Sequence, residues 1–351
     1  MFTLAPTGRW AGLLAASIGL AWTLDLLNLP AAFLLGPMLA AIAFGVGGAG
    51  LRVPKPGFQV AQALVGCLVA HSVTGEIAGT LRHDGVLILA VVLVTVAAGA
   101  VVGWALTRMQ VLPGTTAAWG SSPGGAAAMV AMAEEYGSDP RLVAFMQYVR
   151  VVAVVLCASA VARLVTGGSG TGTAPAASDA APLSMLATLA VGALGAGLAL
   201  ALRLPAGALI GPMLLGAILH ATGLVRMSLP GPLLDAAYVG IGWYVGLRFT
   251  ADTLRETWHA LPGIGIATAA TIALCGVWAW GLTWLLPVDF LTAFLATSPG
   301  GLDSVAIIAV GTGADVSFVL AVQTLRLFVV LLTGPLLARW IARGAPEARR
   351  P

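Results

Sequence analysis

The chain has 351 residues, of which 59% are hydrophobic and only 9% are charged. Soluble domains carry about 25% charged residues, so this composition cannot cover a water-exposed surface. A surface against lipid hydrocarbon requires apolar side chains and penalises charge. The net charge of +3 is spread singly between apolar runs, which excludes a basic stripe that could follow nucleic acid. We therefore expect an all-α polytopic membrane protein.

Apolar runs near the length of a membrane helix, about 17–25 residues, recur along the whole chain. In the first half we expect membrane segments at 10–27, 30–48, 57–73, 85–107, 114–135 and 141–165. In the second half we expect them at 183–201, 205–221, 233–247, 260–286, 290–311 and 316–338. The fifth segment of each half contains Ser-Pro-Gly-Gly. Both of these segments should break, because proline cannot donate to the helical hydrogen-bond ladder and glycine relaxes the backbone.

The second half of the chain restates the first half in the same order. Leu-Gly-Pro-Met at 35–38 returns as Ile-Gly-Pro-Met at 210–213, and Ser-Pro-Gly-Gly at 122–125 returns at 298–301. Two copies of this size indicate an internal duplication of a membrane unit. The Gly-, Ser- and Ala-rich stretch from about 167 to 179 has the composition of a flexible linker. We expect a first membrane repeat at 1–174 and a second at 175–351.

The sequence leaves open whether each broken segment crosses the membrane or dips in and returns. A re-entrant segment with a cytoplasmic N-terminus places more of the basic residues inside, Arg9, Arg52, Lys55 and Arg248 among them. Each repeat then has about five transmembrane helices plus the broken one, which makes the repeats inverted, as in many secondary transporters. We expect about 10–12 membrane segments in all, with both termini in the cytoplasm.

The two breaks are the first candidate site. A helix broken at membrane depth leaves backbone groups that only protein or a water-lined cavity can satisfy. Ser122 and Ser298 stand where they would N-cap the half-helix that follows, whose positive end suits an anion. A packing kink with close helix approach is the alternative. The substrate-binding residues predicted at the breaks are Ser121, Ser122, Pro123, Gly124, Gly125, Thr297, Ser298, Pro299, Gly300, Gly301 and Ser304.

Two arginines in the sixth segments are the second candidate feature. Arg150 and Arg326 lie in the middle of matching segments, and each follows a glutamine, Gln147 or Gln323, by three residues. Residues three apart share a helix face. A charge at the bilayer centre costs at least about 2.5 kcal/mol, so both side chains should face the breaks. They would clamp an anion such as a carboxylate, or neutralise the carbonyl end of a half-helix, or pair with an acid.

That acid is Asp303, which occurs in the second repeat only, because its counterpart is Ala127. An acid beside a helix break can carry a proton or bind Na⁺, so Asp303 is the candidate ion-coupling residue. A fixed counter-ion for Arg150 or Arg326 is the alternative. The histidines and cysteines show no metal-ligand spacing, so we predict no metal and no other cofactor.

The paired Leu-Gly-Pro-Met and Ser-Pro-Gly-Gly…Gln-x-x-Arg motifs resemble those of the AbrB-type membrane duplication family, over residues 9–340. Members of that family carry the labels "ammonia monooxygenase" and "AbrB family regulator", and their layout is similar to that of the cation:proton antiporter and anion transporter superfamily. The resemblance implies a multi-pass protein of the bacterial cytoplasmic (inner) membrane. Copper chemistry needs clustered histidines, which the sequence lacks, so we do not expect an enzyme.

The leading hypothesis is a secondary transporter, or permease, for a small organic anion or an amino-acid-like solute. The alternatives are a membrane sensor that contributes to regulation of gene expression through a partner and, less favoured, a membrane monooxygenase. The sequence contains no ATP-binding Gly-x-x-x-x-Gly-Lys-Ser/Thr loop, which argues against a primary pump. The expected partners are membrane lipids, a small anionic solute and a proton or Na⁺. A homodimer is left open, and no nucleic acid is expected.

Overall fold

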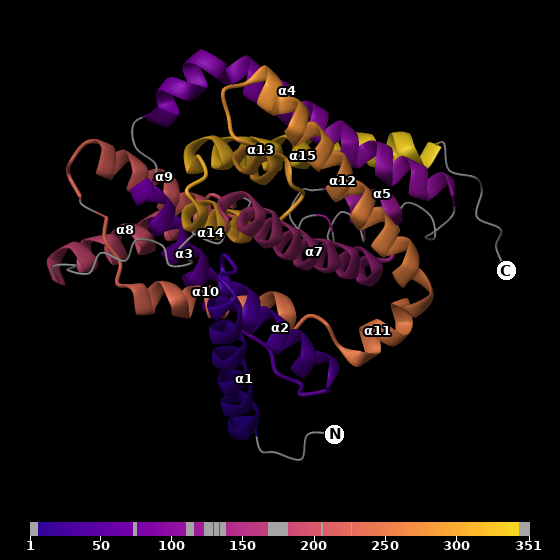
Figure 1. The fold of residues 1–351 in the computed structure, drawn as a ribbon, viewed down its shortest axis with the longest axis horizontal. Coiled ribbons are helices and arrows are strands. Elements are labelled where there is room, and N and C mark those ends of the chain that lie inside the picture. Colours follow the sequence, from indigo (N-terminus) through magenta and orange to yellow (C-terminus); the bar gives the residue numbers. More distant parts are fainter. Residues whose placement is uncertain are drawn as a thin grey trace. The chain divides into compact units, whose positions relative to one another are not determined.

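The computed structural model describes residues 6–72, 76–109, 116–122, 129, 133, 138–167, 182–204, 206–225 and 227–343. Within these ranges every regular element is a helix (Figure 1). The first half contains α1 (Pro6–Leu26), α2 (Ala32–Val46), α3 (Lys55–Ser72), α4 (Glu76–Arg108), α5 (Thr116–Ser121) and α7 (Pro140–Thr166). The second half contains α8 (Pro182–Ala201), α9 (Gly207–Ala221), α10 (Gly231–Gly246), α11 (Ala251–Thr257), the 3₁₀ turn η1 (Trp258–Ala260), α12 (Leu261–Leu285), α13 (Phe290–Thr297), α14 (Leu302–Thr312) and α15 (Val316–Arg343). The all-α class is confirmed.

The helix break in the second half lies where the sequence predicted it. α13 ends at Thr297 and α14 begins at Leu302, so the predicted segment 290–311 is divided at Ser-Pro-Gly-Gly. In the first half, the structure describes the segment 114–135 only at 116–122, 129 and 133. The predicted site residues Pro123, Gly124 and Gly125 therefore lie outside the described residues.

The helices form two compact units, each considered by itself. Unit 1 consists of residues 1–83, 156–251 and 302–319, and unit 2 consists of residues 84–155, 252–301 and 320–351. Each unit thus takes segments from both predicted repeats. Grouping by contact is a different property from sequence duplication, so the repeat boundary near residue 174 stays a prediction.

In unit 1, equivalent helices of the two halves pack in equivalent pairs. α1 packs on α2, and α8 packs on α9. α2 also packs on α10, and α9 packs on α3, so the second helix of each half contacts the third helix of the other. The α1–α2 pair is visible in Figure 1, where the two indigo and violet helices lie side by side. This arrangement is what a duplicated unit with exchanged third helices would produce.

The Gly-Pro motifs bring the helix backbones of unit 1 into close contact. A Cβ on Gly36 of α2 would lie 2.3 Å from the backbone nitrogen of Ala21 in α1. A Cβ on Gly211 of α9 would lie 2.1 Å from the carbonyl oxygen of Gly195 in α8. No other residue type fits at such distances, because real Cβ atoms do not approach backbone atoms so closely. The Gly-Pro motifs thus allow tight helix packing in both halves.

In unit 2, two glycines allow α5 to pack closely against its neighbours. A Cβ on Gly120 of α5 would lie 2.2 Å from the Sδ atom of Met146 in α7. A Cβ on Gly103 of α4 would lie 2.4 Å from the Oγ atom of Ser121. α12 packs on α13 and also touches α5. These contacts bring the C-terminal end of α5 next to the polar residues of α7.

Four helices of the described chain are long and apolar enough to cross a bilayer: Gly85–Arg108, Pro140–Thr166, Pro182–Ala201 and Ala251–Leu285. Four shorter apolar helices accompany them, at Ala32–Val46, Gly207–Ala221, Leu302–Thr312 and Val316–Val330. The total of 10–12 membrane segments and the inverted orientation of the repeats stay predictions.

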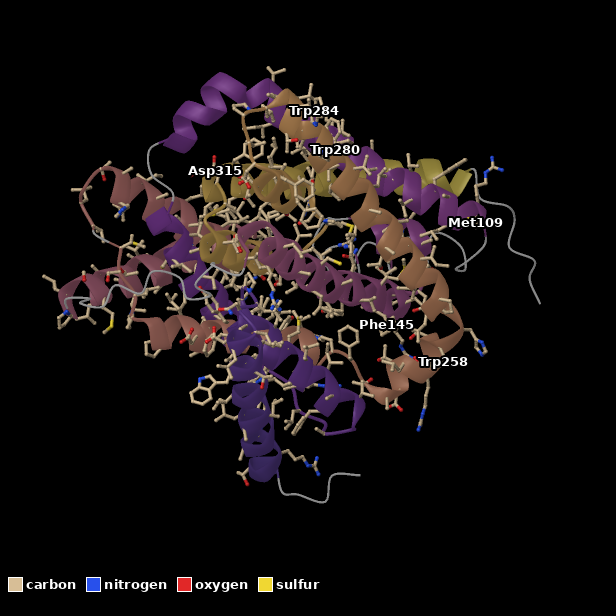
Figure 2. The ribbon with its side chains drawn as sticks, viewed as in Figure 1. Met109, Phe145, Trp258, Trp280, Trp284 and Asp315 are labelled. Carbon is tan, nitrogen blue, oxygen red and sulfur yellow. The ribbon has the colours of Figure 1, made fainter. Side chains whose placement is uncertain are left out.

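The longest candidate span carries exposed tryptophans toward both of its ends. Trp258 lies in η1, and Trp280 and Trp284 lie together on α12 in an edge-to-face pair with ring centroids 6.1 Å apart (Figure 2). At 1.5 Å per residue, Trp258 and Trp280 are about 33 Å apart along the helix, close to the thickness of the hydrocarbon core. Tryptophan is enriched at both membrane–water interfaces. The spacing therefore fits a single span anchored at both surfaces.

The close approach of α8 and α9 gives a test of the fold. In Gly195→Ala the new Cβ would lie 2.7 Å from the backbone nitrogen of Pro212, and overpacking of this kind costs about 1–3 kcal/mol. Gly197, on the same helix, has no atom within 4 Å of the equivalent position. We expect Gly195→Ala to lower the melting temperature of the detergent-solubilised protein and Gly197→Ala to leave it unchanged or raise it. Equal melting temperatures for the two variants would contradict this packing.

Candidate functional site

α13 is a short helix with a defined start and a defined end. Asp289 N-caps it, because its side chain accepts a hydrogen bond of 3.0 Å from the backbone nitrogen of Thr292. Ser298 ends it with an extended backbone (φ −58°, ψ 138°), which is the conformation that a following proline favours. The Ser298 hydroxyl donates back to the carbonyl oxygen of Leu295 at 3.1 Å. The prediction that Ser298 N-caps the half-helix that follows is therefore wrong, since Ser298 is the C-cap of α13.

The serines at the end of α5 behave in the same way. The hydroxyl of Ser122 donates to the carbonyl oxygen of Ala118 at 2.8 Å, and the hydroxyl of Ser121 donates to the same oxygen at 3.3 Å. The hydroxyl of Ser122, predicted to cap the following half-helix, is thus used by the preceding one. The serine side chains are engaged with their own helix, and the carbonyl groups at the helix end are left to other donors.

Arg326 and Gln323 of α15 supply those donors at the end of α13. Gln323 Nε2 donates to the carbonyl oxygens of Leu295 at 2.7 Å and of Ser298 at 3.1 Å. Arg326 Nη1 donates to the Ser298 oxygen at 2.6 Å, and Nη2 donates to the Gly300 oxygen at 3.4 Å. Arg326 Nη2 also donates to Gln323 Oε1, which holds the two side chains together. One glutamine and one arginine thus satisfy the carbonyl end of an interrupted helix.

Arg150 and Gln147 of α7 do the same at the end of α5. Gln147 Nε2 donates to the carbonyl oxygens of Trp119 and Ser122, each at 3.0 Å. Arg150 Nη1 donates to the oxygens of Gly120 (3.3 Å), Ser121 (3.0 Å) and Ser122 (3.2 Å), and its Nη2 donates to Gln147 Oε1. The arginine–glutamine contact confirms that residues 147 and 150 share a helix face.

The two clusters use the same sequence separations. Each glutamine bonds carbonyl oxygens 28 and 25 residues before it, and each arginine bonds the oxygen of the serine 28 residues before it. These matching separations are the ones that the predicted duplication would produce, and the duplication itself stays a prediction. All of these residues belong to unit 2.

The arginine side chains are buried, and part of their donor capacity is unused. Arg150 is 5% exposed and Arg326 is 3% exposed, so both point away from lipid, as expected. The Nε atom of each has no hydrogen-bond partner among the described residues. The two guanidinium groups are close enough for their like charges to interact with one another. The site therefore combines two cations, two idle N–H donors and two carbonyl ends of helices.

The remaining predicted residues of the second break differ in burial and in the helix to which they belong. Thr297 is fully buried and donates to the carbonyl oxygen of Ala293 at 2.9 Å, so its hydroxyl stabilises α13. Pro299 is buried, whereas Gly300 and Gly301 are partly exposed. Ser304 is buried in α14 and belongs to unit 1. A role of any of these residues in binding a substrate stays a prediction.

Asp303 has a partner in unit 1 that the sequence did not reveal. Asp303 lies in the first turn of α14, where a negative charge is favoured by the helix dipole. Gln62 Nε2 of α3 donates to both carboxylate oxygens, at 3.2 Å and 3.1 Å. Gln62 is a buried glutamine in a mostly apolar run, and that polar residue was the available signal. An acid held by an amide can still gain or lose a proton or accept a cation.

The apolar helices, the exposed tryptophans and the polar clusters inside helical packing define an all-helical membrane protein. A sequence model of the family described as "Transition state regulatory protein AbrB" matches residues 33–342, and the chain belongs to this AbrB family. The resemblance seen in the paired motifs is thereby confirmed.

Two relatives support the same assignment. The chain is 46% identical over 344 residues to "Putative regulator AbrB" of Escherichia coli (strain K12), which covers 97% of this chain and 99% of the relative. It is 27% identical over 270 residues to "Uncharacterized protein YhjN" of Bacillus subtilis (strain 168), which covers 72% of this chain and 68% of that relative.

Removal of one amide tests whether these polar contacts hold α13. Gln323→Leu would leave the carbonyl oxygens of Leu295 and Ser298 without the glutamine donor, which costs about 1–3 kcal/mol. Gln59→Leu is the matched control, because Gln59 is a half-buried glutamine of α3 without a hydrogen bond among the described residues. We expect a lower melting temperature for Gln323→Leu only. A melting temperature equal to that of the control would show that the contacts contribute nothing.

Proposed function

We propose that the protein is a secondary transporter for a small organic anion or an amino-acid-like solute, in the cytoplasmic membrane of a bacterium. The binding site in this proposal is the pair of clusters around Arg150 and Arg326 in unit 2. The observation that carries the proposal is the pair of buried guanidinium groups, each with an Nε donor that lacks a partner among the described residues. Multi-pass topology, inverted repeats and cytoplasmic termini are parts of the same proposal.

Electrostatics favours an anion at this position. A helix C-terminus carries about half a negative charge, so each carbonyl end offsets only part of the charge of its arginine. The two guanidinium charges are only partly offset and repel one another, so the site keeps a net positive charge. The attraction between this charge and an anion is stronger in the protein interior than in water, because the dielectric constant is lower. Charge-assisted hydrogen bonds from Nε to a carboxylate are about twice as strong as neutral ones. A carboxylate would use both idle donors and relieve the repulsion.

Secondary transport fits this arrangement better than chemistry does. The contacts around the arginines come from backbone carbonyls and glutamines, which orient a charge but do not supply a nucleophile or a general base. An interrupted helix at membrane depth is the usual location of substrate sites in transporters with repeated halves. We therefore propose a transport protein and not an enzyme.

A membrane sensor is the second candidate function, and the printed name of a relative favours it. The 46% identical relative is called a regulator, which describes that protein. In a sensor, the same arginine site would bind an anion as a signal, and a cytoplasmic partner protein would read the occupied state. Uptake by the purified protein in liposomes would favour the transporter, whereas binding without uptake, together with a stoichiometric cytoplasmic partner, would favour the sensor.

The arginine site is tested with conservative variants. A thermal-shift screen of small carboxylates and amino acids selects the anion whose uptake is then measured in proteoliposomes. Arg150→Lys and Arg326→Lys keep the charge but lose the planar fork and the Nε donor, so we expect uptake to fall at least about tenfold. Arg163→Lys, an exposed position on the same helix as Arg150, should transport normally. Unimpaired uptake by the Arg150→Lys/Arg326→Lys double variant would end the transport proposal.

Ion coupling at Asp303 is a separate expectation. Asp303→Asn removes the ionisable group but keeps a side chain that Gln62 can bond, so the local packing should survive. We expect uptake by this variant to lose its dependence on the proton or Na⁺ gradient. Gln62→Leu, which keeps the carboxylate, should retain a dependence on the gradient. A gradient dependence unchanged in Asp303→Asn would refute the coupling role and leave the arginine site untouched.

A further inference from the structure

One end of unit 1 gathers basic residues from three separate parts of the chain. Arg9 lies at the start of α1, Arg52 and Lys55 lie where the chain enters α3, and Arg248 follows α10. A hydrophobic cluster draws these parts together; its buried members are Leu13, Ala40, Ala41, Ala49, Leu51 and Leu247. Arg9 Nη1 also donates to the carbonyl oxygen of Ala49 at 3.0 Å. Arg9 is therefore bonded to a residue of one packed core, and Arg52 and Arg248 each follow one directly.

Aromatic side chains lie among these basic residues. The rings of Trp10 and Trp243 have centroids 5.5 Å apart, and Phe58 stacks on Tyr244 at 3.8 Å. The guanidinium of Arg248 lies 4.6 Å from the Tyr244 ring centroid and donates to the Tyr244 hydroxyl at 2.8 Å. Tryptophan and tyrosine with adjacent basic residues are the composition of a protein surface at the level of lipid headgroups.

The acidic residues of the same helices lie at the opposite end. Asp25 is near the end of α1 and Asp235 is near the start of α10, whereas Trp10 near the start of α1 contacts Trp243 near the end of α10. At 1.5 Å per residue, Asp25 is about 24 Å from Arg9 along α1, and Asp235 is about 20 Å from Arg248 along α10. α1 and α10 thus run antiparallel, with cations at one end and carboxylates at the other. Such separation is the charge distribution of a unit oriented by the positive-inside rule.

We infer that this basic–aromatic end of unit 1 binds the phosphate headgroups of anionic phospholipids in the cytoplasmic leaflet. Arg52, Lys55 and Arg248 are exposed, and the apolar Val60 in the second turn of α3 is 61% exposed. A soluble anionic partner would account for the charges but not for the exposed valine and the half-buried aromatic rings near them. Anionic lipid accounts for both, because each basic residue near such a surface contributes about 1 kcal/mol. This inference shares the cytoplasmic placement of the N-terminus with the proposed function but does not depend on transport.

A charge-matched pair of variants tests the inference with defined probes. The full-length protein in detergent is titrated with short-chain phosphatidylglycerol, short-chain phosphatidylcholine and inorganic phosphate, and binding is measured by calorimetry. We expect phosphatidylglycerol to bind preferentially, and Arg52→Gln/Lys55→Gln to weaken its binding on the order of tenfold. Arg163→Gln/Arg203→Gln, which removes two exposed cations elsewhere in unit 1, should bind like the wild type. Only variants whose melting temperature without lipid equals that of the wild type are compared.

The chain contains a single lysine, which provides a second readout. Acetylation of Lys55 by a water-soluble amine reagent, followed by mass spectrometry, should be several times slower in phosphatidylglycerol nanodiscs than in phosphatidylcholine nanodiscs. Equal affinities for the two lipids, or an unchanged affinity in Arg52→Gln/Lys55→Gln, would overturn the inference. Equally tight binding of inorganic phosphate would also overturn it, because the site would then recognise a free anion and not a membrane surface.

Discussion

A helix that stops inside a membrane must find donors for its last carbonyl groups, and the rest of this structure depends on how that demand is met. Water is absent from the hydrocarbon, so each unpaired group costs several kcal/mol. At the ends of α5 and α13 the demand is met by a glutamine and an arginine, from α7 and from α15 respectively. The solution is costly, because it buries a cation. In the function that we propose, this buried charge attracts an anion.

The signs of the charges follow the helix dipole on both sides of the second break. Arg326 lies at the C-terminal end of α13, where a cation is favoured, and Asp303 lies in the first turn of α14, where an anion is favoured. Each charge therefore stabilises the end of a helix as well as being available for function. The structure accordingly supports the capping role proposed for the arginines, and the Nε donors without partners among the described residues mean that the proposed anion binding does not compete with capping.

Local sequence patterns predicted the parts of the fold that local physics decides. Pro299 and the glycines after it predicted the helix break, because these residues act on their own backbone. The role of Ser298 was predicted with the wrong direction, since a serine before a proline can end one helix or begin the next and only the extended backbone decides. The partner of Asp303 was not predictable, because Gln62 reaches it through the packing of α3 on α14. The composition of the two units from segments of both halves likewise depends on tertiary contacts.

We propose that the buried arginines retain free Nε donors that bind an organic anion. The ¹⁵N NMR resonances of the arginine Nε groups in the detergent-solubilised protein report on this directly, with Arg150→Lys and Arg326→Lys used for assignment. We expect the Nε resonances of Arg150 and Arg326 to shift saturably as the selected carboxylate is added, while those of exposed arginines such as Arg163 do not. Resonances of both buried arginines that stay unchanged at saturating anion would contradict it.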